Sequence, residues 1–376
     1  KALANIPAAS IGDNWLNIDT PALVVDLDNL EHNLTTMAAY AKQQNVRLRP
    51  HSKSHKCPAI AHQQMALGAV GVCCQKVSEA QVMVNHGVLD VLVSNQVVGR
   101  AKLERLAALA LQAKIMVCVD DLANIQEMNE AAKCFNATIN VLVEVNVGSG
   151  RCGVLPGEPV LALANAIRES ENLHFSGLQA YHGVAQHIRS YEGRRRAILD
   201  ATYQIEQTIE LLTMHDLECD VVGGGGTGTY IFEATGGIYN ELQVGSYVFM
   251  DHDYSLNLND QGQQMNEFKQ SLFIKAAVLS KPQSNRCVLD AGLKAYSTDS
   301  GLPIVHGVEN AKVLGAADEH TKISFDSSLP VPKLGESVAL LPSHCDPTVN
   351  LHDWLIGIRN SQVQAIWPIA ARGALL

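Results

Sequence analysis

The sequence predicts an α/β protein in which a (β/α)8 barrel of the TIM type is joined to a second, mainly β domain. Two observations support this class. Eight short runs rich in β-forming residues alternate with helical patterns between residues 47 and 250, as in a (β/α)8 barrel. From about residue 265 the chain instead shows strands joined by turn residues. The length of 376 residues suits two domains, since single cores stop growing at roughly 250 to 300 residues.

The expected barrel strands follow one another along the first two thirds of the chain. They are RLRPHSK (47–53), GVCCQK (71–76), DVLVSN (90–95), KIMVCVDD (114–121), INVLVEVNVG (139–148), FSGLQAYHG (175–183), CDVVGGGG (219–226) and ELQVGSYVFM (241–250). Most stretches between them, such as residues 58–69, 98–111 and 158–170, carry apolar residues at helical spacing. The last interval, residues 226–240, is short for a helix.

One further strand precedes the barrel. The segment TPALVVDLDNLEHNL (20–34) lies outside the count of eight, so we expect its strand to pair with the C-terminal sheet before the first helix enters the barrel. These patterns place the barrel domain at residues 20–260 and the β domain at residues 1–19 and 261–376.

Composition and charge exclude several classes of partner. The formal net charge of -10 provides no overall positive field, so we expect neither nucleic acid nor a membrane surface as a partner. Apolar runs are interrupted before the roughly 20 residues that a membrane span needs, and the start KALANIPAAS lacks the apolar core of a signal peptide. We therefore expect a cytoplasmic protein. The nine cysteines include no CxxC pair, which favours reduced, buried thiols over a disulfide framework.

The stretch RPHSKSHK (49–56) concentrates basic side chains at one expected strand end. If residues 47–53 form a strand, alternation places Arg49, His51 and Lys53 on the inward side, and Lys56 falls in the following loop. Active sites of barrel enzymes lie at the C-terminal mouth. Lys53 would then occupy a partly dry pocket, where its pKa can fall and its amine can attack a carbonyl. The alternative is an inward lysine that merely pairs with a carboxylate.

A glycine-rich run, VVGGGGTGT (221–229), follows another expected barrel strand. Successive amides without side chains form a nest that binds phosphate, although a tight turn would explain the same glycines. The run matches neither a P-loop nor a dinucleotide fingerprint. A lysine nucleophile and a phosphate nest at one barrel mouth are what pyridoxal phosphate requires, because that cofactor needs a covalent amine at one end and an anion anchor at the other.

A third cluster, LPSHCDPTVNLHD (341–353), lies in the expected β domain. In an extended strand His344 and Asp346 point the same way while Cys345 points oppositely, so the imidazole and the carboxylate form half of a divalent-cation site. The alternative is a surface histidine beside a turn-forming Asp-Pro. Further polar groups fall at expected strand ends, among them Arg151, Tyr181, His182, His187 and Gln243.

The motifs RPHSK, VGGGGTGT, YHG and PSHCDPT together resemble a known family. They are similar to those of the fold-type III pyridoxal phosphate enzymes, the alanine racemase-like barrels, and specifically to the branch of D-threonine aldolase and D-serine dehydratase. The likeness runs from residue 19 to residue 359 with the motifs in the family's order.

The resemblance assigns cofactor contacts along the chain. It implies that Lys53 carries pyridoxal phosphate covalently, that Arg151 meets the phenolic oxygen, and that Tyr247 closes the phosphate pocket. The implied phosphate donors are Gly224, Gly225, Gly226, Thr227, Gly228, Gly245 and Ser246. Alanine racemases have an arginine facing the pyridine nitrogen, whereas this chain has Gln243 at that position. A neutral amide weakens the ring as an electron sink, which leaves more of the activation to a metal.

The same resemblance implies that His344 and Asp346 bind the cation. Dehydratases of the branch tend to have cysteine at the second ligand position, whereas Cys345 here stands one residue earlier. An oxygen ligand favours Mn2+ or Mg2+ over Zn2+, which stays an alternative, and the pattern is similar to the aldolase type.

The implied activity is that of a lyase dependent on pyridoxal phosphate and a divalent metal, cleaving a D-threonine-like D-3-hydroxy-amino acid to glycine and an aldehyde. His187 is the preferred base, His182 and Tyr181 orient it or the ring, and Asp318 is a weaker candidate for the metal shell. Alternatives are a dehydratase acting on D-serine or D-3-hydroxyaspartate, an amino-acid racemase, a cofactor-carrying protein without turnover, and a metal-dependent hydrolase. Only the hydrolase leaves Lys53 and the glycine run unexplained.

The resemblance also implies a quaternary arrangement. We expect a head-to-tail homodimer in which the β domain of one chain approaches the barrel mouth of the other. In that case the metal ligands and Lys53 could come from different chains.

Overall fold

The barrel strands are the first feature of the fold, which a computed structural model describes for residues 6–326 and 330–376. Over these residues, eight parallel strands form one sheet in the order β2-β9-β8-β7-β6-β5-β4-β3. Their bounds are β2 (Arg47–Leu48), β3 (Val72–Cys74), β4 (Asp90–Gln96), β5 (Lys114–Val119), β6 (Ile139–Glu144), β7 (Leu173–Gln179), β8 (Val221–Gly224) and β9 (Glu241–Leu242). A parallel bridge between His51 and Cys73 joins the two ends of this order. The predicted barrel and its eight strands are confirmed.

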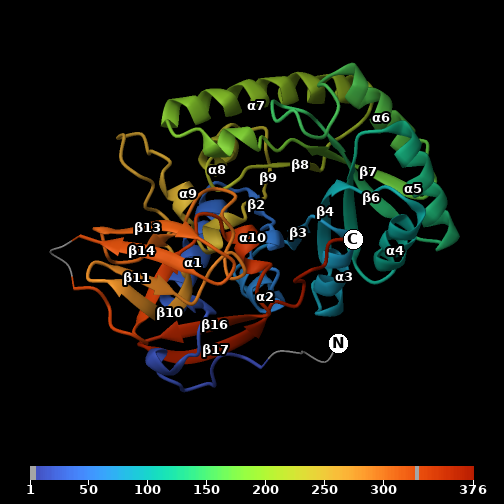
Figure 1. The fold of residues 1–376 in the computed structure, drawn as a ribbon. Helices are drawn as coiled ribbons and strands as arrows, with labels where there is room; N and C mark the ends of the chain where they lie inside the picture. Colours follow the sequence, from blue (N-terminus) through green and yellow to red (C-terminus); the bar gives the residue numbers. More distant parts are fainter. Residues whose placement is uncertain (1–5, 327–329) are drawn as a thin grey trace.

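Helices between the strands form the outer layer, which Figure 1 shows as an arc from α3 to α7. Three of them begin at a side-chain cap: Asp26 at α1, Asp121 at α5 and Ser190 at α7. The interval after β8 holds only the six-residue α8, as short as the sequence indicated. The bounds are α1 (Leu27–Gln43), α2 (Pro58–Ala66), α3 (Val77–Asn85), α4 (Arg100–Ala110), α5 (Leu122–Cys134), α6 (Glu158–Arg168), α7 (Tyr191–Met214) and α8 (Tyr230–Thr235).

The second sheet lies beside α1, where Figure 1 shows its orange and red strands. Its main path runs β13-β14-β11-β10-β1-β16-β17, and β15 pairs with β10 and β12. The bounds are β1 (Ala22–Asp26), β10 (Leu272–Gln283), β11 (Arg286–Leu289), β12 (Ile304–Val305), β13 (Ala311–Ala316), β14 (Thr321–Phe325), β15 (Ser337–Leu341), β16 (Trp354–Arg359) and β17 (Gln362–Pro368). A short helix, α10 (Cys345–Val349), follows β15.

The early strand β1 ties the two parts of the chain together. It pairs antiparallel with β10 and parallel with β16, which confirms the expected pairing with the C-terminal sheet. Its residues fall inside the range 20–260 that we assigned to the barrel, so this part of the range lies in the second sheet. Of the range 1–19, residues 1–5 lie outside the described residues. One apolar core joins the two sheets through α1, with members such as Leu30, Val248 and Leu355.

Short helical turns follow several barrel strands at their carboxyl ends. They are η2 (Ser52–Ser54), η3 (Val184–His187), η4 (Ser246–Val248) and α9 (His252–Ser255); the turn η1 (Trp15–Asn17) precedes β1. Below them, the barrel interior is filled by six buried side chains, Cys73, Leu92, Met116, Cys118, Leu142 and Val221. The site therefore has a packed floor.

Two expectations from composition concern the chain as a whole. The nine cysteines are free and six of them are buried, which confirms the expectation of unpaired thiols. Among the helices of the described residues, none is both long and apolar enough to cross a membrane.

Candidate active site

A cavity of about 240 Å³ opens at the carboxyl ends of the barrel strands. Turns after β2, β6, β7, β8 and β9 border it, and the turn after β15 in the second sheet closes one side. This is the face at which barrel enzymes place their active sites. Its lining residues are His51, Lys53, Gln75, Ser94, Arg151, Gln179, Tyr181, Gly183, His187, Gly226, Thr227, Gln243, Gly245, Ser246, Tyr254, His344 and Asp346.

Lys53 reaches this cavity from a turn rather than from a strand. The strand β2 ends at Leu48, and Lys53 lies in η2, where its backbone N–H donates to Nδ1 of His51 at 3.3 Å. The argument from strand alternation was therefore wrong, although Lys53 does line the cavity at the barrel mouth. The Nζ atom lies 3.6 Å from Oδ2 of Asp346, and the side chain keeps 38% of its surface exposed.

The charge environment of Lys53 also differs from the expectation. Burial lowers its pKa, but the attraction of Asp346 and Tyr181 together with a hydrogen bond to Asp346 outweighs burial, so the net pKa is raised. Our expectation of a lowered pKa for Lys53 was wrong, because the Asp346 carboxylate faces the amine. The ion pair with a carboxylate that we held as an alternative is present, yet it lies inside the cavity.

The other basic residues of the stretch have separate places. Lys56 lies in the loop after η2, as expected, and its side chain is buried outside the cavity. Arg49 is buried and donates to Glu241 at 2.9 Å and to Asp90 at 2.6 Å, so it holds barrel strands together and does not line the cavity. His51 does line the cavity, and burial lowers its pKa well below the usual value.

The glycine run forms a cradle whose shape excludes larger residues. A Cβ atom on Gly226 would lie 2.4 Å from Oε1 of Gln186, and Gly225 has a φ of +79°. The Gly228 N–H donates to that same Gln186 oxygen at 3.0 Å. Within residues 6–326 and 330–376, the backbone N–H groups of Gly226 and Thr227 have no hydrogen-bond acceptor. Two free amides at the cavity wall, in a turn that only glycine permits, fit a phosphate group.

Of the predicted phosphate contacts, some point into the cavity and some do not. Gly226, Thr227, Gly245 and Ser246 line it. Gly224, at the end of β8, and Gly225 and Gly228 do not line it, and the Gly228 N–H is already bonded to Gln186. The Tyr247 ring is buried in the core and its hydroxyl accepts from Gln64 at 3.0 Å, so the expected closure of the pocket by this ring was wrong. Only its backbone N–H reaches the run, donating to the Thr227 hydroxyl at 2.9 Å.

Gln243 lines the cavity as predicted and is held by a partner that the sequence did not suggest. Gln179 Nε2 donates to Gln243 Oε1 at 2.6 Å, and Gln243 Nε2 donates back to Gln179 Oε1 at 2.9 Å. Both side chains are buried. This reciprocal pair fixes the orientation of a neutral amide at the floor of the cavity, where the resemblance places the pyridine nitrogen.

Tyr181 and Arg151 lie together on another wall. The Arg151 guanidinium stands 5.8 Å from the centre of the Tyr181 ring, and both line the cavity. Burial raises the pKa of Tyr181, so its hydroxyl stays protonated. His182 does not line the cavity. Its Nδ1 accepts from the Ala185 N–H at 3.3 Å and its Nε2 faces Gly148, so our expectation that it orients the base was wrong.

The predicted cation pair comes from a helix start, not from an extended strand. His344 is the N-cap residue of α10 and Asp346 lies in its first turn, so the geometry that we assumed was wrong. Both side chains nevertheless line the cavity, while Cys345 is buried. They belong to the same chain as Lys53 and face the same cavity, so two chains are not needed to bring them together.

The donor atoms of this pair fit a divalent cation. The Oδ1 atom of Asp346 is buried and has no hydrogen-bond partner among the residues that the structure describes. The Nδ1 atom of His344 lies 2.7 Å from Oδ2 of Asp299, which leaves Nε2 free to ligate and orients the ring as a carboxylate does behind a metal-binding histidine. Over the described residues no three acidic, histidine or cysteine side chains are placed so that together they could hold a metal ion, so water or substrate must complete the shell. Asp318 lies outside the cavity, where its carbonyl accepts from Lys294.

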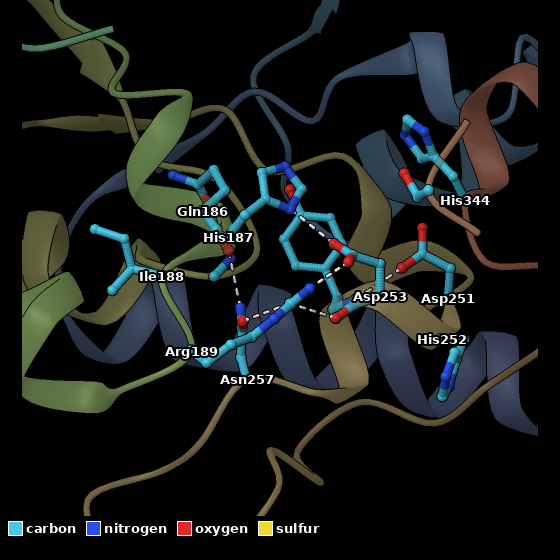
Figure 2. A network of polar contacts seen from close by, with 12 residues as sticks. Gln186, His187, Ile188, Arg189, Asp251, His252, Asp253, Asn257 and His344 are labelled. Carbon is cyan, nitrogen blue, oxygen red and sulfur yellow. Dashed lines mark hydrogen bonds and ion pairs between the residues drawn. The ribbon is translucent and has the colours of Figure 1, made fainter. Parts of the chain in front are cut away.

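His187 lines the opposite side of the mouth and is paired with a carboxylate. Its Nδ1 lies 2.7 Å from Oδ2 of Asp253, an acid of α9 that sequence reasoning missed, and Figure 2 shows this contact beside Arg189. Burial raises the pKa of Asp253, but hydrogen bonds from Arg189 and His187 outweigh burial, so the net pKa is lowered. No local pattern marked Asp253, because Asp253 lies 66 residues from His187 along the chain.

Comparisons with known proteins identify the class to which this fold and site belong. Residues 25–253 match the family described as "Alanine racemase, N-terminal domain", and residues 271–358 match the "Putative serine dehydratase domain". The chain belongs to the alanine racemase-like, fold-type III family of pyridoxal phosphate enzymes, as the resemblance implied.

Individual relatives are similar over their full length. The D-threonine aldolase of Arthrobacter sp is 46% identical over 99% of this chain and 98% of its own, and a 3-hydroxy-D-aspartate aldolase of Paracoccus denitrificans (strain Pd 1222) is 43% identical over 98% and 96%. The crystal structure of D-threonine aldolase from Filomicrobium marinum is 49% identical, with a TM-score of 0.96 over 98% of this chain and all of that chain. A D-threo-3-hydroxyaspartate dehydratase structure from Delftia sp. HT23, 23% identical with a TM-score of 0.85, shares the fold.

Proposed function

We propose that this protein is a lyase, dependent on pyridoxal phosphate and a divalent cation, that cleaves D-3-hydroxy-amino acids such as D-threonine to glycine and an aldehyde. The observation that carries the proposal is the shared cavity. One cavity is lined by Lys53, by His344 and Asp346, which fit a cation, and by the glycine turn, which fits a phosphate. The Lys53 Nζ atom lies 3.6 Å from Asp346. The full-length likeness to aldolases of D-threonine and 3-hydroxy-D-aspartate supports this activity.

The cofactor-binding role would be divided among residues of the barrel. Lys53 would hold pyridoxal phosphate through its amine, the free amides of Gly226 and Thr227 with Ser246 would bind the phosphate, and Gln243 would face the pyridine nitrogen. Arg151 would meet the phenolic oxygen. When bound, the cofactor takes up the electron pair that is released at the substrate Cα.

The reacting hydroxyl would lie between the second domain and His187. His344 and Asp346 would hold a cation, Mn2+ or Mg2+ rather than Zn2+ because one ligand is a carboxylate. A bound cation would lower the pKa of the substrate's β-hydroxyl, and Nε2 of His187 would accept the hydroxyl proton. The oxygen would form the aldehyde carbonyl as the Cα–Cβ bond breaks. Cα would then gain a proton, in net the one that left the hydroxyl, and leave as glycine. Tyr181, protonated and half-buried, borders the same space.

Product analysis tests the proposal. The holoprotein would be incubated with D-threonine and with 3-hydroxy-D-aspartate, each with and without Mn2+, and with the L-isomers as controls. We expect glycine and an aldehyde from the D-isomers only, and only with the metal. Formation of a 2-oxo acid and ammonia would instead identify the dehydratase alternative, and D/L interconversion without cleavage would identify a racemase.

The quaternary and cellular expectations stay proposals. The family resemblance supports a head-to-tail homodimer, and the cytoplasmic location rests on the sequence expectation alone. Light scattering of the purified holoprotein would report a mass near twice 40.6 kDa if the dimer forms.

A further inference from the structure

The candidate base and its carboxylate come from two separate segments of the mouth. His187 ends η3 after β7, and Asp253 lies in α9 after β9. Their contact, 2.7 Å between Nδ1 and Oδ2, is a normal hydrogen bond. A carboxylate accepts and does not donate, so the imidazole proton lies on Nδ1 and the lone pair of a neutral ring lies on Nε2. The His187 side chain is 53% exposed and borders the cavity.

Asp253 is itself held in place by a second group. Arg189 donates from Nη2 to Oδ1 of Asp253, and from Nη1 to the Asp253 carbonyl at 2.7 Å and to Asn257 Oδ1 at 3.0 Å. Figure 2 shows Arg189 spanning these acceptors. The guanidinium therefore keeps Asp253 ionised and leaves Oδ2 directed at the imidazole. The α9 turn that carries Asp253 is capped by Asp251, which accepts from the Tyr254 N–H at 3.0 Å.

The backbone beside His187 is fixed from the other side by Gln186. Asn257 Nδ2 donates to the Gln186 carbonyl at 2.9 Å. The Gln186 side chain accepts from the Gly228 N–H at 3.0 Å and donates to the Thr229 hydroxyl at 2.8 Å. The segment with His187 is thus bonded both to α9 and to the glycine run. The backbone of His187 is therefore held in place, and Asp253 needs to orient only the ring.

We propose that Asp253 is a positioning residue, which holds the proton of His187 on Nδ1 so that Nε2 is the atom that accepts the substrate's β-hydroxyl proton. Arg189 acts behind it by holding the Asp253 carboxylate. The catalytic part of this inference rests on the proposed lyase function, whereas the tautomer of His187 is a property of the protein alone.

Two substitutions separate this role from a merely structural one. In Asp253→Asn the amide oxygen still accepts from Arg189, but the amide nitrogen donates to Nδ1 and forces the His187 proton onto Nε2. Asp253→Ala removes the constraint and leaves the ring free to adopt either tautomer. We expect kcat for glycine formation to fall by about 10²- to 10³-fold in Asp253→Asn and by only about 10-fold in Asp253→Ala, with KM changing less than about 3-fold.

The decisive result is which of the two variants, Asp253→Asn or Asp253→Ala, has the lower kcat. If Asp253 only anchors Arg189, asparagine preserves more of the contact than alanine and must be the more active variant, which would overturn the proposal. Asp260→Asn, at an exposed acid outside the cavity, is the matched control and should keep the activity of the parent protein.

A spectroscopic measurement tests the tautomer without any turnover. In holoprotein labelled with ¹⁵N-histidine, the His187 signals are assigned by their loss in His187→Gln. At a pH where the ring is neutral, we expect Nδ1 to carry the proton in the parent protein and Nε2 to carry it in Asp253→Asn. A parent ring protonated on Nε2, or a tautomer unchanged by Asp253→Asn, would overturn the proposal. If the tautomers are as expected but no substrate yields glycine, the proposed lyase function would be refuted and the proposed role of Asp253 in setting the tautomer would stand.

Discussion

The barrel wall of the cavity and the wall supplied by the second domain differ in how far their polar groups are already satisfied. On the barrel wall Gln179 and Gln243 bind each other at both amide ends, and Gln186 holds the glycine run. On the second-domain wall, as far as the structure describes the chain, Asp346 Oδ1 has no hydrogen-bond partner and the His344 ring is held through one nitrogen only. The polar groups of the barrel wall are thus already fixed in the positions that cofactor binding requires. The second-domain wall instead leaves ligand positions for a cation and substrate.

The largest expected effect concerns the lysine that distinguishes the barrel wall. Lys53→Arg keeps the charge but removes the amine that joins the cofactor, so we expect kcat/KM for cleavage to fall by more than about 10³-fold. The visible absorbance of the bound cofactor should be lost with it. Lys56→Arg is the matched control, because Lys56 lies three residues further on, outside the cavity. Equal losses in the two variants would remove Lys53 from its assigned role.

A second pair of variants examines the opposite wall. Asp346→Asn keeps the size of the side chain but weakens its bond to a cation, and we expect a loss of about 10²- to 10³-fold in kcat/KM at low Mn2+ with the cofactor spectrum retained. Asp299→Asn, which changes the hydrogen-bond partner of the His344 ring, should lower metal affinity by about 10- to 100-fold. Excess Mn2+ should restore the second variant more fully than the first. Loss of the cofactor in Asp346→Asn would show that the walls are not separable.

A third prediction tests whether the barrel wall carries a protonated acid. Glu233 is buried behind the glycine run and accepts from Thr229 at 2.7 Å; burial raises its pKa to about 7. The folded protein then keeps a proton that the unfolded chain has lost, so stability falls as pH rises from 4.5 to about 7, by roughly 3 kcal/mol.

The measurement for Glu233 is denaturant unfolding with excess cofactor at several pH values in this window. Glu233→Gln has no proton to lose, so it should lack this part of the pH dependence. Parallel curves for the two proteins would show that Glu233 ionises normally.

The smallest expected effect concerns the reciprocal amide pair. Gln179→Leu leaves the buried amide of Gln243 without its partner and should lower the free energy of unfolding by about 1 to 3 kcal/mol. The double variant Gln179→Leu/Gln243→Leu removes both polar groups and should regain most of that loss. Additive losses in this cycle, measured by chemical denaturation, would contradict a mutual pair.

The sequence predicted the fold and the barrel wall well for a local reason. Buried parallel strands are short apolar runs between helical patterns, and a glycine turn such as that around Gly226 is marked by its own residues. The details after β2 were mispredicted because the chain leaves the sheet after His51, whose N–H donates to the Val244 carbonyl at 2.9 Å. The turn η2 begins at the next residue, so Lys53 enters the cavity from a turn.

The second-domain wall was harder to predict because its geometry depends on tertiary contacts. His344 and Asp346 were recognised, but a helix start brings them to the cavity and no strand does. Asp253, Asp299 and Gln179 were missed, since each acts through a partner at least 45 residues away. His182 was selected for its place in a motif, and packing turns its ring away.

Metal removal from the holoprotein tests most directly the claim that one cavity combines two separable walls. Glycine release from D-threonine and the visible absorbance of the cofactor would be followed in one sample during titration with a chelator and then with Mn2+. We predict that cleavage is lost and then restored while the cofactor absorbance persists throughout. Glycine formation that continues without any metal, or cofactor release that accompanies metal removal, would contradict the account.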